Sequence, residues 1–227
     1  PGWMGPGDPV PPVAPQDQRD SIAGRMFDYP FGQNISIRPR HNEAVSFDQM
    51  RQLSDGYDLM RLVIETRKDQ LAKLEWAIRP KKAAAGEDPR CAEIQRFFEL
   101  PDQENTWDNW LRMLLEDLLV IDAPTLYPRL TRGGGLYALE PVDGATIKRV
   151  IDERGRTPMP PDPAYQQIIK GMPAVDYTRD ELIYRPRVVR THKVYGYSPV
   201  EQVIMTVQIA LRRQLSQLEF FTMGTMP

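Results

Sequence analysis

The sequence of 227 residues contains a single cysteine, Cys91, and two histidines, His41 and His192. One cysteine excludes an internal disulfide framework and favours a reducing compartment. Two histidines far apart in the sequence and one cysteine are too few ligands for the usual zinc sites. The sequence therefore predicts neither a metal site nor a bound cofactor.

The sequence also lacks a long apolar run and a strong net charge. No run approaches the roughly 18–20 residues that span a membrane, and the first residues have no signal-peptide pattern. The formal net charge is −2 and the pI is about 5.8, whereas proteins that grip duplex DNA through many phosphates are usually basic. The simplest interpretation is a soluble cytosolic α+β protein with long loops.

Motifs for catalysis are also missing. No serine or histidine lies in a nucleophile-elbow context. The run Gly133–Gly135 lacks the Lys-Ser/Thr of a phosphate-binding loop and indicates a hairpin turn instead. Neighbouring acids at Glu116-Asp117 and Asp180-Glu181 are interpreted as solvated faces, because adjacent residues on a helix point to different sides. We expect no catalytic site and no enzymatic activity in this chain.

Prolines are abundant, and eight of the 22 lie within residues 1–45, where apolar periodicity is weak. This composition predicts an extended Pro-rich N-terminal arm. The arm would lie either on its own domain or on a neighbouring subunit. The sequence begins at Pro1 without a methionine, and we expect it to be a fragment of a longer product.

Helical periodicity begins at a capping box formed by Ser46 and Gln49. Apolar residues follow at helical spacing, and they form either a domain core or a coiled-coil seam. These residues are Met50, Leu53, Tyr57, Met60, Ile64, Leu71 and Leu74. Gly56 predicts a break near residues 54–56. Alternation over residues 74–79 predicts a strand that ends at Pro80.

The middle of the chain predicts a mixture of helices and short strands. Helices are expected at residues 90–99 and 107–121, with Thr106 as the N-cap of the second. Strands are expected at 123–130, 136–142, 145–151 and 165–169, and a last strand begins at Leu182. The first two strands form a hairpin across Gly133–Gly135.

The last thirty residues predict a tight turn and a long capped helix. Ser198 is the expected N-cap, Pro199 the first helical residue and Glu201 the reciprocal partner of a capping box. One apolar face follows at spacings of three and four. It contains Val200, Val203, Ile204, Val207, Leu211, Leu215 and Leu218. Gly224 and Pro227 are expected to end the helix.

This segment resembles the signature of tailed-bacteriophage portal proteins of the HK97-like family: a G-x-S-P-hydrophobic-E turn, a long helix and an F-F-x-x-G-x-x-P end. The matching residues are Gly196, Ser198, Pro199, Glu201, Phe220, Phe221, Gly224 and Pro227. The family usually has asparagine where Met223 stands. Residues 64–78 are similar to another block of the family, a helix running into a strand that bears Trp76. The resemblance spans residues 45–227.

The resemblance implies an α+β wing-and-core portal fold, with a wing-like α/β domain at 46–197 and a long helix at 198–227 leading toward a stem that is missing from this chain. The Pro-rich arm at residues 1–45 comes from composition and lies outside the resemblance. It implies a structural subunit of a closed ring, usually of about a dozen copies, at one capsid vertex of the virion, assembled in the host bacterial cytoplasm. The ring would be the channel for packaging and ejection of double-stranded DNA. Its partners would be the major capsid or scaffold protein, the terminase and the head–tail connector proteins, with no membrane.

Some residues are candidates for contacts. The basic run with Arg185, Arg187, Arg190 and Lys193 either pairs with local carboxylates or contacts DNA phosphates or an acidic neighbour. Arg212 and Arg213 are candidates for an inter-subunit contact on the long helix. Trp107 and Trp110 lie three apart on one helical face, where they either pack in the core or anchor an interface.

Two other classes of function remain open from the residues. One is a nucleic-acid-processing enzyme or its DNA-binding accessory subunit, with the basic run as its DNA contact. The other is a monomeric scaffold or adaptor module built around the Pro-rich arm. Solution mass and the salt dependence of DNA binding distinguish these classes from a ring.

Overall fold

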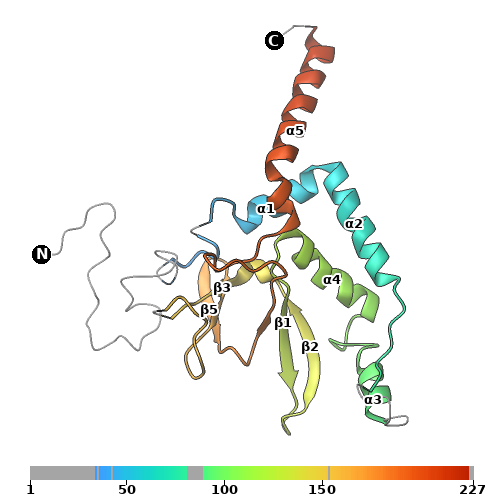
Figure 1. Ribbon diagram of the computed structural model, residues 1–227, viewed down its shortest axis with the longest axis vertical. Coiled ribbons are helices and arrows are strands. Elements are labelled where there is room, and N and C mark those ends of the chain that lie inside the picture. Colours follow the sequence, from blue (N-terminus) through green and yellow to red (C-terminus); the bar gives the residue numbers. More distant parts are fainter. Residues whose placement is uncertain (1–33, 35, 42, 81–88, 153, 225–227) are drawn as a thin grey trace, which may run out of the picture.

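The computed structural model describes residues 34, 36–41, 43–80, 89–152 and 154–224. Within them the chain has the predicted α+β fold, with five α-helices and two three-stranded antiparallel sheets (Figure 1). The helices are α1 (Phe47–Gly56), α2 (Asp58–Ala72), α3 (Pro89–Phe97), α4 (Trp107–Val120) and α5 (Pro199–Met223). The strands are β1 (Thr125–Leu130), β2 (Leu136–Val142), β3 (Ile147–Arg149), β4 (Tyr165–Ile169), β5 (Met172–Tyr177) and β6 (Ile183–Tyr184).

The first sheet has the order β2-β1-β6 and the second the order β3-β4-β5. The predicted hairpin across residues 133–135 is confirmed, because β1 pairs with β2 from Thr125 opposite Val142 to the turn. Strand β5 was not predicted. It pairs with β4 through a turn in which Lys170 and Gly171 both have positive φ, 52° and 77°. Such a turn suits a tight hairpin, but Lys-Gly carries a weaker signal than Asn-Gly.

The core lies where α1, α4 and the first turns of α5 meet both sheets. Its fully buried members come from all of these elements. They include Met50, Val120, Ile121, Ile147, Leu182 and Val200. Met60 and Ile64 extend the core along α2, so that part of the predicted stripe belongs to a domain core. The described part of the N-terminal segment joins the same body, since Asn34 hydrogen-bonds both the N–H and the C=O of Ile151.

The break between α1 and α2 follows the prediction from Gly56. The Ser46 hydroxyl accepts from the N–H of Gln49, and the Gln49 side chain accepts from the N–H of Ser46, so the capping box is complete. Helix α1 ends at Gly56, Tyr57 has extended backbone, and α2 begins at the next residue.

The prediction of a strand at residues 74–79 is wrong. These residues pair with no strand of the described chain, and Leu74 is exposed together with Leu71. Trp76 instead packs its ring against Phe98 and Trp107, with centroids 6.0 and 4.7 Å away. Alternation here reflects one aromatic contact and not a hydrogen-bonded ladder.

Helix α5 begins as predicted. The Ser198 hydroxyl accepts from the N–H of Glu201 at 3.0 Å, and Pro199 is the first helical residue. The reciprocal half of the capping box is not made, because the Glu201 carboxylate accepts from Arg40 at 2.5 Å. Gly224 closes the helix with φ of 63°. Pro227 and most of the predicted arm, residues 1–33, 35 and 42, lie outside the described residues.

The C-terminal half of α5 leaves the body and projects away from it (Figure 1). Val200 and Val207 are buried, whereas Val203, Leu215 and Leu218 are exposed. The apolar face predicted for the whole helix therefore packs on its own domain only along its first turns.

Candidate subunit interface

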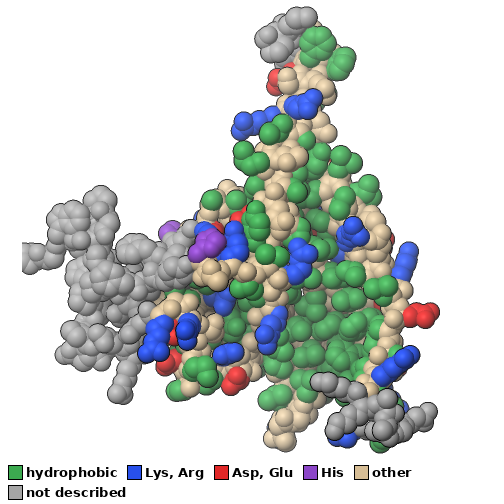
Figure 2. Space-filling model, in the orientation of Figure 1, with side chains coloured by type: hydrophobic (Ala, Val, Ile, Leu, Met, Phe, Trp, Pro, Cys, Tyr) green, Lys and Arg blue, Asp and Glu red, His purple; other side chains and the backbone are tan. Residues whose placement is uncertain are grey.

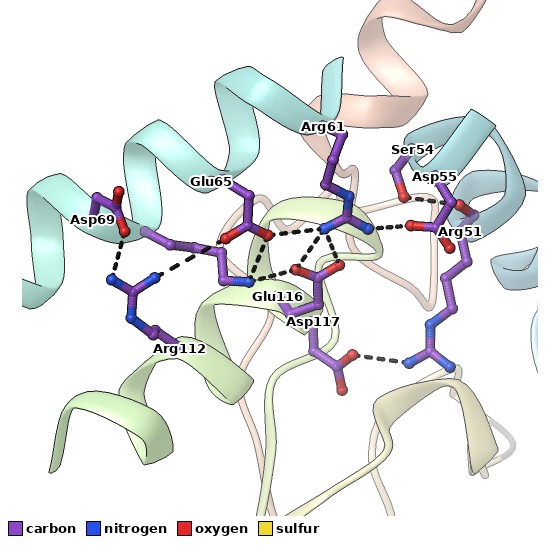
Figure 3. Close-up of polar contacts among 10 residues, drawn as sticks. Arg51, Ser54, Asp55, Arg61, Glu65, Asp69, Arg112, Glu116 and Asp117 are labelled. Atoms are coloured by element: carbon purple, nitrogen blue, oxygen red, sulfur yellow. Dashed lines mark hydrogen bonds and ion pairs between the residues drawn. The ribbon is translucent and has the colours of Figure 1, made fainter. Parts of the chain in front are cut away.

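A network of ion pairs connects α1, α2 and α4 (Figure 3). At its centre the Glu116 carboxylate lies 2.9 Å from Arg61 Nη1 and 2.9 Å from Lys68 Nζ. Arg112 Nη2 lies 2.5 Å from Asp69 Oδ1, and Arg61 also pairs with Asp55. The charged side chains on this flank thus pair with each other within the chain, and they fix α2 against α4.

The prediction that Glu116 and Asp117 form a solvated face is wrong. Asp117 faces Arg51 at 2.9 Å and accepts the N–H of Gly144 at 2.9 Å. Burial raises the pKa of Asp117, and the Gly144 hydrogen bond and the Arg51 charge oppose that effect. The two acids do point to different sides, because Glu116 faces α2 and Asp117 faces α1. Asp180 and Glu181 are exposed as expected.

Helix α2 also carries exposed apolar residues. Leu59, Leu62 and Val63 recur at spacings of three and four and form one ridge, here called the α2 ridge. Their exposed fractions are 57%, 62% and 60%. A helix on the surface of a soluble monomer usually presents polar side chains on its exposed side. The α2 ridge is therefore an apolar face that the described chain does not cover.

A second uncovered face lies on α5. Leu211, Leu215 and Leu218 continue the row begun by Val200 and Val207, and this continuation is here called the α5 stripe. Leu211 is partly buried, but Leu215 and Leu218 are 59% and 60% exposed because the body ends beneath them. Figure 2 shows hydrophobic side chains along the projecting helix and over a broad area beside α4 and β1.

The other candidates on α5 are also exposed. Arg212 and Arg213 face solvent, and no ion pair within the described residues involves them. Phe220 and Phe221 contact each other with ring centroids 5.5 Å apart, and Phe221 is among the most exposed apolar residues of the described chain. These aromatic rings extend the apolar surface to the end of the helix.

The core role predicted for Trp107 and Trp110 holds for Trp110, whereas an interface role for Trp107 stays a prediction. Trp110 is buried and donates its Nε1–H to the carbonyl of Leu139 at 2.8 Å, so it packs in the core. Trp107 is partly exposed and stacks on Trp110 with centroids 5.4 Å apart. Both belong to an aromatic cluster with Trp76 and Phe98.

The basic run likewise divides. Lys193 Nζ lies 2.7 Å from Glu43, and the Arg190 guanidinium lies 4.2 Å above the Tyr197 ring. Arg185 and Arg187 are exposed. The local-carboxylate interpretation describes Lys193, whereas Arg185 and Arg187 keep charges that the described chain does not pair.

The packing of the turn before α5 explains why the motif has a glycine at position 196. The buried Asp122 carboxylate accepts the N–H groups of Arg187 and Val188 at 2.6 and 2.9 Å. Gly196 packs on Asp122 so closely that a Cβ there would lie 2.4 Å from Oδ2. Sequence reasoning did not find Asp122, because it follows α4 in an ordinary Ile-Asp-Ala context.

Two classes of site receive no support in the part of the chain that the structure describes. It contains no group of three or more His, Cys, Asp or Glu residues that could hold a metal ion. None of its helices is long and apolar enough to cross a membrane.

No family model and no curated protein matches this sequence. Among solved structures, the chain is similar to one from the "Neck of empty GTA particle computed with C6 symmetry", with a TM-score of 0.66 and 11% identity over 85% of this chain and 50% of that chain. A chain of the "Virion of native gene transfer agent (GTA) particle" has a TM-score of 0.66 and 10% identity, over 94% of this chain and 52% of that chain. A chain from the "Neck of native GTA particle computed with C12 symmetry" has a TM-score of 0.63 and 11% identity, over 84% of this chain and 48% of that chain. This likeness shows a shared fold, and the chain spans about half the length of these neighbours.

Proposed function

We propose that the chain is a structural subunit of a portal-type ring in the neck of a phage-like particle. Two independent lines support this proposal. The Gly196 to Gly224 segment resembles the portal signature, and the fold is shared with chains from necks described with sixfold or twelvefold symmetry. On this proposal the ring lies at one capsid vertex of the virion, passes double-stranded DNA during packaging and ejection, and docks the terminase and the head–tail connector proteins.

The observation that carries the proposal is the α5 stripe. A closed ring needs two different faces on each subunit, because its head-to-tail contacts are heterologous. The α5 stripe and the α2 ridge are two such faces, and both are apolar and uncovered. Burying a leucine contributes about 1.5–3 kcal/mol, so a few of these side chains per contact favour association appreciably.

The chemistry of the chain suits mechanical work. The ion pairs around Glu116 hold α2 and α4 as one rigid block, which would let a ring keep its shape under load. A formal net charge of −2 suits a wall that guides DNA without gripping it. The proposal assigns no catalytic step to this chain and leaves DNA translocation to the terminase.

The test replaces the apolar stripe by charge. In the complete gene product, Leu215→Lys with Leu218→Lys is expected to abolish ring formation and to leave the monomer folded, because both side chains are exposed in the subunit. The matched control is Gln214→Lys with Gln217→Lys, which adds the same charge beside the stripe. Mass photometry should show rings for the wild type and the control and monomers for the leucine variant. Rings of unchanged mass in the leucine variant would exclude the α5 stripe as an interface.

A further inference from the structure

A cleft of about 580 Å³ lies where β3 and β6 approach each other, beside the loop that follows β3. Five arginines line it: Arg149, Arg154, Arg156, Arg179 and Arg185. Only Arg185 belongs to the basic run that the sequence singled out, and the others come from three separate segments. Figure 2 shows Lys and Arg side chains gathered over this part of the molecule.

Among the described residues of the lining, Asp152 is the one acidic residue, and its carboxylate already accepts hydrogen bonds. Its Oδ1 accepts the backbone N–H groups of Arg154 and Arg156 at 2.8 and 2.7 Å, which folds the loop. The described lining thus contains five arginines and one aspartate. No carboxylate in the described chain forms an ion pair with Arg154, Arg156, Arg179 or Arg185.

This arrangement differs from the rest of the subunit. Around α1, α2 and α4 each arginine of the network faces one or more carboxylates, as Arg51 faces Asp117 and Asp143. Like charges that lie close together repel each other, so a cluster of this kind is typical of a site that an anion neutralises. Guanidinium groups match phosphate oxygens with two parallel hydrogen bonds.

The walls of the cleft favour contact with a nucleic-acid backbone over contact with bases. Tyr165 and Tyr184 line it, but both rings are buried and lie against each other with centroids 5.8 Å apart. Arg149 is fixed over the Tyr184 ring at 5.5 Å and donates to Thr157. Single-strand binding by stacking needs exposed aromatic faces, and the cleft offers none within its described lining.

We propose that the arginine cleft binds consecutive phosphates of the DNA backbone without reading sequence. A single phosphate group can face few of these arginines at once, whereas a run of phosphodiesters supplies one charge per nucleotide along the cleft. The inference rests on the proposed function for the presence of DNA, but it assigns the contact to a site outside the α5 stripe and the α2 ridge. DNA binding at one cleft is also compatible with the small net charge of the chain, because the positive charge is concentrated there.

The test measures binding of a fluorescent random-sequence duplex to the complete gene product over a range of salt concentrations. The variant Arg154→Gln, Arg156→Gln, Arg179→Gln is compared with Arg67→Gln, Arg96→Gln, Arg132→Gln, which removes the same charge from exposed positions elsewhere. We expect the cleft variant to bind about tenfold or more weakly and its salt slope to fall by about 0.9 for each lost phosphate contact. The control variant should change affinity less than threefold, roughly the effect of net charge alone.

A third variant, with lysine at the same three cleft positions, guards against loss of folding. It keeps the charge and is expected to recover most of the salt slope. Equal losses in the cleft and control variants would overturn the proposal, as would preferential binding of poly-glutamate over DNA, which would assign the cleft to an acidic protein segment. The mass of each variant is read in parallel. If the cleft variant forms intact rings but loses DNA binding, the result supports the cleft proposal. If the protein forms no rings but its DNA binding still depends on the cleft, the result contradicts the ring proposal and leaves the cleft proposal intact.

Discussion

At the scale of single residues, Gly196 shows how a motif position acquires its identity from packing. The turn into α5 lies against Asp122, whose carboxylate holds two backbone N–H groups of the preceding loop. A side chain at Gly196 would displace both the Asp122 carboxylate and its backbone oxygen, which would lie 2.7 Å from the new Cβ. The glycine is required for close approach and not for a positive φ.

We predict that Gly196→Ala destabilises the protein by about 3 kcal/mol, because overpacking of a buried contact typically costs 1–3 kcal/mol or more. The matched control is Gly56→Ala, where a Cβ meets nothing within 4 Å. Since glycine is the weaker helix former, the control should be neutral or about 1 kcal/mol more stable. Urea unfolding measures the free energy of unfolding of both variants. A Gly196→Ala variant as stable as the wild type would show that the contact with Asp122 is not tight.

Asp102 gives the fold a pH dependence. Burial alone would raise the pKa of this carboxyl, but hydrogen bonds from the Asn105 and Glu104 backbones and the Asn105 side chain outweigh it and lower the pKa below the usual 3.8. A lowered folded pKa means that this stabilisation is complete above pH 3.8 and disappears as the pH falls through the folded value.

We therefore predict that Asp102→Asn lowers the free energy of unfolding by about 1–2 kcal/mol at neutral pH, because it loses charge-assisted hydrogen bonds. The gap to the wild type should narrow as the pH falls from about 5 to about 2. Urea midpoints across this range measure the gap. A gap that stays constant with pH would show that the Asp102 charge contributes nothing.

At the scale of elements, Arg40 joins the segment before α1 to the start of α5. Its side chain is fully buried, donates to the carbonyls of Val45 and Gly196, and pairs with Glu201 at 2.5 Å. The pair takes the place of the reciprocal cap of α5. Two segments far apart in the sequence are thus held together where the projecting helix leaves the body.

Arg40→Met is expected to cost about 3–5 kcal/mol, because it leaves the Glu201 carboxylate without its buried partner. Arg40→Met with Glu201→Gln should recover part of that loss. The control, Arg38→Met, breaks an exposed pair with Asp48 at 3.8 Å and should cost less than about 1 kcal/mol. Thermal or urea unfolding of these three proteins and of the single variant Glu201→Gln tests the coupling. A double variant as unstable as the sum of its singles would contradict it.

Elements governed by local signals were predictable from the sequence. The capping box at Ser46, the break at Gly56, the β1–β2 turn and the N-cap at Ser198 each depend on a few neighbouring residues. Features governed by tertiary contacts were not. Strand β5 forms through pairing with β4, and Leu215 is exposed because the domain ends beneath it. The arginine cleft gathers residues from four segments, and the sequence marked only Arg185.

At the scale of the whole molecule, uneven surfaces matter more than the totals. A formal net charge of −2 conceals a cleft whose described lining has five arginines and one aspartate. A modest hydrophobic content likewise conceals two apolar faces, on α2 and α5, that the described chain leaves uncovered. Such faces on one subunit are expected at interfaces between copies. On the proposed function, neighbouring copies of the chain would cover these faces.

The most direct test is the solution mass and electron-microscopic image of the complete gene product at physiological salt. The account predicts a closed, symmetric ring with a central channel, in which α2 of one subunit contacts α5 of the next. A protein that stays monomeric up to high concentration would contradict the ring and favour an adaptor module.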